Sequence, residues 1–162
     1  MTEEDPLDEG NILASVKTYL GKVHQRLIFF HEEEKDPLRV IACRSEAIDR
    51  LLVQLYQMAE RSFAKKGFHA ALLSQGGYGR RELCLHSDID ILLLHDGKAQ
   101  EFVQHLNEKV IQVLWDAGLE VGFAVRTVRD CRQLMDQDMT ILTSLLDART
   151  LVGDRNLFDD FC

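Results

Sequence analysis

A glycine-rich turn stands between two apolar segments of this chain, and the second segment begins with two closely spaced aspartates. The turn occupies residues 76–82 (Gly-Gly-Tyr-Gly-Arg-Arg-Glu), and residues 87–94 read Ser-Asp-Ile-Asp-Ile-Leu-Leu-Leu. Short apolar runs bounded by glycine and polar residues are typical of buried strands. We therefore predict strands near residues 68–75 and 88–95, joined through a tight turn.

The glycine pair allows two conformations that other residues rarely offer. Gly76 and Gly77 can take a positive φ, or let the backbone approach a ligand closely, because they carry no Cβ. Residues 78–83 are predicted to form one or two helical turns, whose free N–H groups suit phosphate oxygens. An ordinary strand-to-helix turn explains the same pair, and glycine pairs mark such turns far more often.

The two aspartates are predicted to share one face of the second strand. Side chains two apart on a strand point the same way, so Asp88 and Asp90 lie together with Cα atoms roughly 6.5 Å apart. Ile89 and Ile91 then point into a core. Two neighbouring carboxylates repel each other and raise a pKa. Mg²⁺ relieves this repulsion and binds carboxylates together with substrate phosphates. The alternative is a strand end with two solvated aspartates.

The remaining pattern indicates an α+β fold, a small mixed sheet flanked by helices with an N-terminal helical arm. Residues 1–66 are predicted to form this arm, with 1–10 mobile, and residues 67–162 to form the core. The predicted helices span 12–31, 36–66 and 98–117; a third strand spans 119–125, and a capping box at 127–130 opens a further helix. Trp115 is predicted to be buried on its helix face.

Taken together, the motifs resemble the polymerase β-like nucleotidyltransferase superfamily. More narrowly, the chain is similar to the N-terminal domain of the bacterial protein-PII uridylyltransferase/uridylyl-removing enzymes, over roughly residues 47–158. The positions that match the family one by one are Gly76 to Arg80, Glu82, Leu83 and Ser87 to Asp90, and residues 114–122, 125–127, 145–149 and 153–154 resemble its following segments. Four positions depart from it: Gln75, Arg81 (usually glycine), and Phe123 and Ala124 (usually His-Ser).

The resemblance implies a chemistry for these positions. Asp88 and Asp90 are expected to bind Mg²⁺ in a two-metal mechanism, with UTP as the nucleotide and a tyrosine of the PII signalling protein as the acceptor. The expected nucleotide-binding residues are Gly76, Gly77, Arg80 and Ser87. Another acceptor, or an inactive domain that binds nucleotide or a partner, stays an alternative. The resemblance also implies that the chain is truncated near residues 158–162 and lacks the uridylyl-removing and glutamine-sensing parts of the family.

A third carboxylate is usual in this superfamily. Along the predicted third strand, Glu120, Gly122, Ala124 and Arg126 share one face by alternation. Glu120 is therefore the local candidate. A solvated glutamate at a sheet edge is at least as good an explanation.

Charge and composition exclude other classes of function. The formal net charge of −8 argues against a nucleic-acid partner. No apolar run approaches the length of a membrane span, and the acidic start does not resemble a signal peptide, so we expect a cytoplasmic protein without a membrane partner. His95-Asp96 matches the dipeptide of HD phosphohydrolases, but it closes a predicted strand at a turn and is not expected to bind metal.

Overall fold

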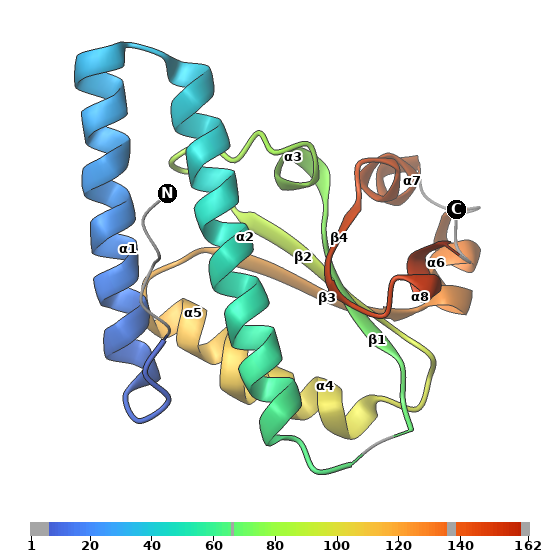
Figure 1. The fold of residues 1–162 in the computed structure, drawn as a ribbon. Helices are drawn as coiled ribbons and strands as arrows, with labels where there is room; N and C mark the ends of the chain where they lie inside the picture. The colour runs from blue at the N-terminus through green and yellow to red at the C-terminus, as the bar shows by residue number, and fades with distance from the viewer. Residues whose placement is uncertain (1–6, 66, 136–138, 160–162) are drawn as a thin grey trace.

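The computed structural model describes residues 7–65, 67–135 and 139–159, and places a four-stranded sheet between two layers of helices (Figure 1). The elements in chain order are α1 (Ile12–Phe29), the π-helical turn η1 (Phe30–Glu34), α2 (Pro37–Ser62), β1 (Ala70–Ser74), α3 (Gly76–Gly79), β2 (Ile89–His95), α4 (Gln100–Leu106), η2 (Asn107–Ile111), α5 (Gln112–Asp116), β3 (Val121–Thr127), α6 (Val128–Met135), α7 (Met139–Leu146), β4 (Arg149–Gly153) and α8 (Asn156–Asp159).

The sheet is mixed, which confirms the predicted α+β class. Its strand order is β3-β2-β1-β4. Strand β1 runs antiparallel to both β2 and β4, whereas β2 and β3 are parallel. The parallel pair is joined by the α4–α5 crossover, as parallel strands require. This order puts β2, which carries Asp90, beside β3, which begins one residue after Glu120.

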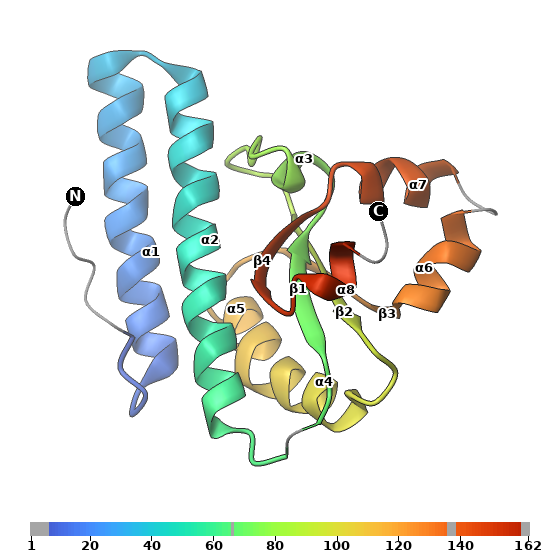
Figure 2. The ribbon, with the colours of Figure 1, turned by 45° about the vertical axis from the view of Figure 1, so that its right-hand side comes forward.

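Alternation along β2 divides the apolar side chains between the two faces of the sheet. Ile89, Ile91 and Leu93 pack with α1, α2 and the α4–α5 segment in the larger core. Leu92 and Leu94 pack on the opposite face with α6, α7 and α8. Figure 2 shows these two helical layers on either side of the strands. The predicted burial of Ile89 and Ile91 is confirmed, since each is 1% exposed.

The N-terminal helices form a long hairpin against the larger core. Asp36 caps α2 by accepting hydrogen bonds from the backbone N–H groups of Leu38 and Arg39, with Pro37 in the first turn. Helix α1 runs through Gly21 without a break, and α2 ends at Ser62, four residues before the predicted end. Both helices contribute to the same core as β1 and β2. The domain division at residue 66 stays a prediction.

Two local predictions were wrong. The helical turn expected at residues 78–83 lies at Gly76–Gly79, so the glycines belong to the turn themselves. Trp115 is 50% exposed, although its neighbour Leu114 is buried. The Trp115 indole N–H donates to the carbonyl oxygen of Val121, 3.3 Å away, which places the ring over the outer strand β3.

One further prediction can be checked in the structure, and two others concern residues that it describes only in part. The capping box is confirmed, because the side chains of Thr127 and Asp130 each accept a hydrogen bond from the other residue's backbone N–H. The expected mobility of residues 1–10 and the chain end at residues 158–162 lie wholly or partly outside the described residues. In the described part of the chain, every helix is too short or too polar to cross a membrane.

Candidate active site

The glycine turn and the aspartate strand meet at one end of the sheet. Strand β1 ends at Ser74, opposite Ile91 of β2, and the backbone N–H of Gln75 donates to the carbonyl oxygen of Asp90 at 3.0 Å. The chain then turns through Gly76, whose φ of +54° lies in the left-handed region that glycine adopts easily. The turn closes with a bond from the Glu82 N–H to the Gly77 carbonyl oxygen, 2.8 Å long.

The Asp90 carboxylate lies between the glycine turn and strand β3. Its Oδ2 is 3.8 Å from the position that a Cβ would take at Gly76, and its Oδ1 is 2.5 Å from the corresponding position at Gly122. Asp90 and Gly122 are paired in the parallel register of β2 and β3. Gly122 therefore leaves the space that this carboxylate occupies, whereas a Cβ at Gly76 would be in ordinary van der Waals contact with it.

The charge of Asp90 is unfavourable in its surroundings. Partial burial raises the pKa of Asp90 above its usual value, and the nearby carboxylate of Asp88 raises it further. Both residues are exposed, and Asp88 immediately precedes β2. The two predicted metal ligands are thus close enough to interact, and a bound cation would remove the repulsion between them.

Arg80 leaves the glycine turn and is fixed by two carboxylates. Its Nε donates to Glu82 at 2.8 Å, and its Nη1 donates to Asp147 at the end of α7. These partners raise the pKa of the exposed Arg80. The remaining nitrogen, Nη2, is 3.9 Å from the position that a Cβ would take at Gly77. The guanidinium therefore flanks the turn, where the sequence predicts phosphate.

The other two predicted site residues, Ser87 and Glu120, are both exposed and lie just outside the strands. Ser87 is exposed in the loop before β2, and its backbone N–H donates to Cys84 at 3.1 Å. Glu120 is exposed one residue before β3, and its carbonyl oxygen accepts the Ile89 N–H at 2.9 Å. Within the described part of the chain, no three His, Cys, Asp or Glu side chains come together as metal ligands. The role of Glu120 stays a prediction.

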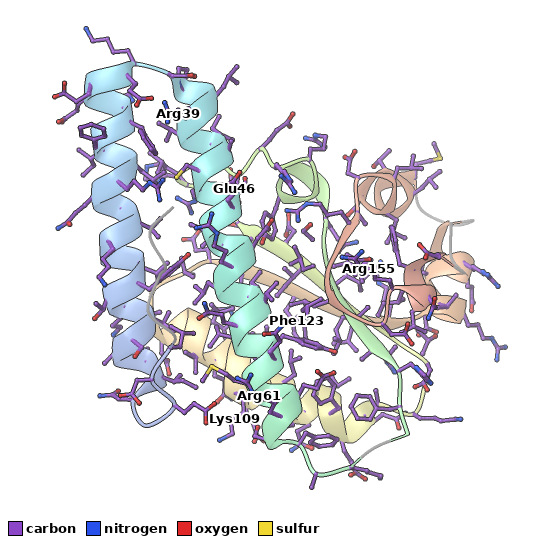
Figure 3. The ribbon with its side chains drawn as sticks, in the orientation of Figure 1. Arg39, Glu46, Arg61, Lys109, Phe123 and Arg155 are labelled. Atoms are coloured by element: carbon purple, nitrogen blue, oxygen red, sulfur yellow. The ribbon has the colours of Figure 1, made fainter. Side chains whose placement is uncertain are left out.

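The predicted faces of the third strand are confirmed by packing. Val121 and Phe123 (labelled in Figure 3) pack against the larger core, and Ala124 packs against the core on the opposite face. Phe123, where the resembled family tends to have histidine, therefore points away from the face of Asp90. This departure does not place an apolar ring at the aspartates.

A cluster behind the turn was missed by the sequence analysis. Asp49 of α2 accepts two hydrogen bonds on Oδ1, one from the Tyr78 hydroxyl at 2.7 Å and one from Arg149 Nη2 at 2.8 Å. The Nε of Arg149 donates to the carbonyl oxygen of Gly79 at 3.2 Å. We call Asp49, Tyr78 and Arg149 the Asp49 cluster. It links α2, the glycine turn and β4.

Residues 8–125 match the nucleotidyltransferase family DUF294, which covers well over half of the chain. This chain belongs to the DUF294 nucleotidyltransferase family. It is also similar to proteins named bifunctional uridylyltransferase/uridylyl-removing enzyme. That of Haemophilus influenzae (strain 86-028NP) is 42% identical over 74% of this chain, and that of Stutzerimonas stutzeri (strain A1501) is 36% identical over 90%. The chain spans 14% and 16% of the length of these two relatives.

The departure at Arg81 has a clear cost in this nucleotidyltransferase. Arg81 has a φ of +64°, in the region that favours glycine. Arg81→Gly is therefore expected to relieve roughly 1 kcal/mol of backbone strain in the folded chain. Part of this gain in the free energy of unfolding is offset, because glycine also gives the unfolded chain more conformational entropy. Urea unfolding measures the change. Arg81→Ala is the matched control, because it removes the side chain and keeps the backbone strain. Equal stability of the two variants would contradict the prediction.

Gly122 is expected to matter for ligand binding more than for stability of the nucleotidyltransferase. In Gly122→Ala, the new Cβ meets the end of the Asp90 side chain at 2.5 Å, and that carboxylate can rotate away. We expect about tenfold weaker Mg²⁺-dependent nucleotide binding, with a loss of less than about 1.5 kcal/mol in unfolding free energy. Calorimetric titration and urea unfolding of the same sample separate the two effects. Unchanged affinity would show that the position of the Asp90 carboxylate is not critical.

Proposed function

We propose that this chain transfers UMP from UTP to a tyrosine hydroxyl of a PII-type signalling protein in a Mg²⁺-dependent reaction. The observation that carries the proposal is the hydrogen bond between the two halves of the motif, from the Gln75 N–H to the Asp90 carbonyl oxygen at 3.0 Å, with the Asp90 carboxylate beside the glycine turn. Membership of a nucleotidyltransferase family and the names of the relatives support the reaction type and the uridylyl group. UTP, the acceptor and the metal are our inference.

The donor set fits Mg²⁺. Asp88 and Asp90 offer two hard carboxylate ligands at a place where the pKa of Asp90 is already raised by burial and by Asp88. Mg²⁺ prefers oxygen ligands and completes its coordination with waters and substrate phosphates. When bound there, the ion would neutralise charge on the triphosphate. Mg²⁺ takes one or two carboxylates from a protein, which Asp88 and Asp90 supply, and Glu120 stays the predicted third carboxylate.

The residues of the turn would hold the triphosphate. The backbone of Gly76 and Gly77 lets phosphate oxygens approach closely, while Arg80 presents Nη2 beside them and Ser87 offers a hydroxyl from the following loop. The acceptor hydroxyl attacks the α-phosphorus, a new P–O bond forms, and the bond to pyrophosphate breaks as the hydroxyl proton passes to solvent. The chain contributes mainly positioning and charge stabilisation.

Isothermal titration with a non-hydrolysable UTP analogue tests this proposal. Binding is expected with Mg²⁺ and not with EDTA, and it should be lost in the Asp88→Asn/Asp90→Asn double variant. A CTP analogue and an ATP analogue under the same conditions test the base. Absence of binding to all three nucleotides would overturn the proposal.

Transfer is tested separately with α-labelled UTP and purified PII protein. Label on PII and release of pyrophosphate would support uridylyl transfer, and a Tyr→Phe acceptor protein is the control. Label on another protein or small molecule would replace the acceptor in the proposal. Binding without pyrophosphate release would support a nucleotide-binding domain without turnover.

A further inference from the structure

The glycine turn is held by bonds from outside it. Helix α3 has only four residues, and a helix this short is not stable by itself. The Asp49 cluster supplies outside contacts from two directions: α2 contributes Asp49, and β4 contributes Arg149. Tyr78, whose hydroxyl donates to Asp49, is 2% exposed, and the Arg149 guanidinium carbon is 5.6 Å from the centre of its ring.

The cluster is charged although it is largely buried. The side chains of Asp49 and Arg149 are 18% and 24% exposed. A buried ion pair adds little net stability compared with apolar side chains of the same size, because both charges lose hydration. Its hydrogen bonds, however, fix the directions of the groups that they join. Burial and the Asp49 carboxylate also raise the pKa of Tyr78, which keeps its hydroxyl a donor.

We propose that the Asp49 cluster positions the glycine turn against Asp90, and that Asp49 and Arg149 thereby set the affinity for the nucleotide without touching it. Asp49 and Tyr78 orient the turn from α2, and Arg149 holds its last carbonyl at Gly79. The part of this inference that concerns affinity rests on the proposed function. The part that concerns the position of the turn does not.

The test compares two variants that each remove the hydroxyl group of a buried, hydrogen-bonded tyrosine. Tyr78→Phe removes the bond to Asp49 and keeps the ring. The matched control is Tyr56→Phe, because the buried Tyr56 hydroxyl donates to the Ala70 carbonyl oxygen at 3.2 Å, at the opposite end of β1. Asp49→Asn is a third variant of unchanged shape. All are measured by hydrogen–deuterium exchange without ligand and by titration with Mg²⁺ and the UTP analogue.

Tyr78→Phe and Asp49→Asn are expected to speed exchange of the amides of residues 79–82, which bond back to carbonyls of residues 75–78. Both should weaken nucleotide binding by about tenfold, since hydrogen bonds to charged groups have this order of effect. Tyr56→Phe should change either value by less than about twofold. If Asp49→Asn does not fold, Tyr78→Phe carries the test.

The outcomes separate this inference from the proposed function. Unchanged exchange at residues 79–82 in Tyr78→Phe, or faster exchange with unchanged affinity, would overturn the positioning role. Equal effects of Tyr78→Phe and Tyr56→Phe on affinity would also overturn it, because a purely structural bond would then explain both. If the parent chain binds no nucleotide, the proposed function fails, and the exchange rates alone decide whether the cluster positions the turn.

Discussion

Asp90→Asn is expected to abolish Mg²⁺-dependent nucleotide binding and to lower any transferase rate by about 10³-fold or more, because metal-ion stabilisation of phosphate charge contributes several kcal/mol. Asparagine keeps the size of the side chain but removes the charge that would hold the cation. Titration calorimetry and pyrophosphate release measure the two losses. Asp159→Asn, on an exposed residue of α8, is the control for the loss of one charge.

The same variant is expected to have a higher melting temperature than the parent chain in EDTA at neutral pH. Because the pKa of Asp90 is raised in the folded chain, its protonated form favours folding. The stabilisation of the fold by protonated Asp90 is complete below the pKa of an unfolded aspartate, about 3.9. It is lost as the pH rises through the higher pKa that Asp90 has in the folded chain. At neutral pH the ionised Asp90 therefore destabilises the fold, and asparagine removes that effect.

Mg²⁺ with the UTP analogue should reverse the order of the two melting temperatures. At a ligand concentration 100 times the Kd, binding stabilises the parent by about 2.7 kcal/mol, and the variant gains nothing. A variant that loses activity but also melts lower in EDTA would contradict this account, since the loss could then come from misfolding.

Gly79→Ala is expected to cause the largest loss of stability among single methyl additions near the site. The new Cβ would lie 2.1 Å from the carbonyl oxygen of Asp147 and 2.9 Å from its carbon. These are backbone atoms, so relief requires the turn and the α7–β4 connection to separate. We expect a loss of about 3 kcal/mol in the free energy of unfolding, measured by urea denaturation.

Gly21→Ala provides the control for a glycine without such contacts. Its added Cβ meets nothing within 4 Å on α1, and alanine favours a helix over glycine by roughly 0.5–1 kcal/mol. The two identical substitutions should therefore change stability in opposite directions. A Gly79→Ala variant as stable as the parent would show that the close approach to Asp147 is not needed.

The strands that carry the site could be predicted from the sequence because their signals are local. The apolar runs before Gly76 and after Asp88 are long enough to mark β1 and β2, and alternation assigned Asp90 and Ile91 to opposite faces. The glycine turn was also recognised, although its helical residues start earlier than expected. At these positions the local preference and the final packing agree.

The parts that could not be predicted depend on distant contacts. Strand β4 has only two large apolar residues, Leu151 and Val152, and its place beside β1 is set by pairing across the sheet. Asp49 lies on the amphipathic helix α2, where nothing in the local pattern separates it from solvated charges. Trp115 borders the buried stripe formed by Val110, Ile111 and Leu114, and its exposure is decided by the neighbouring edge of β3.

The pairing of Asp49 with Arg149 also bears on the order in which the chain can fold. The two residues are 100 positions apart, so their contact closes a very long loop. The α1–α2 hairpin and the β1–β2 pair involve shorter separations and are expected to form earlier. The glycine turn would then stay loosely held until β4 docks, and nucleotide binding would be the last property that a refolding chain regains.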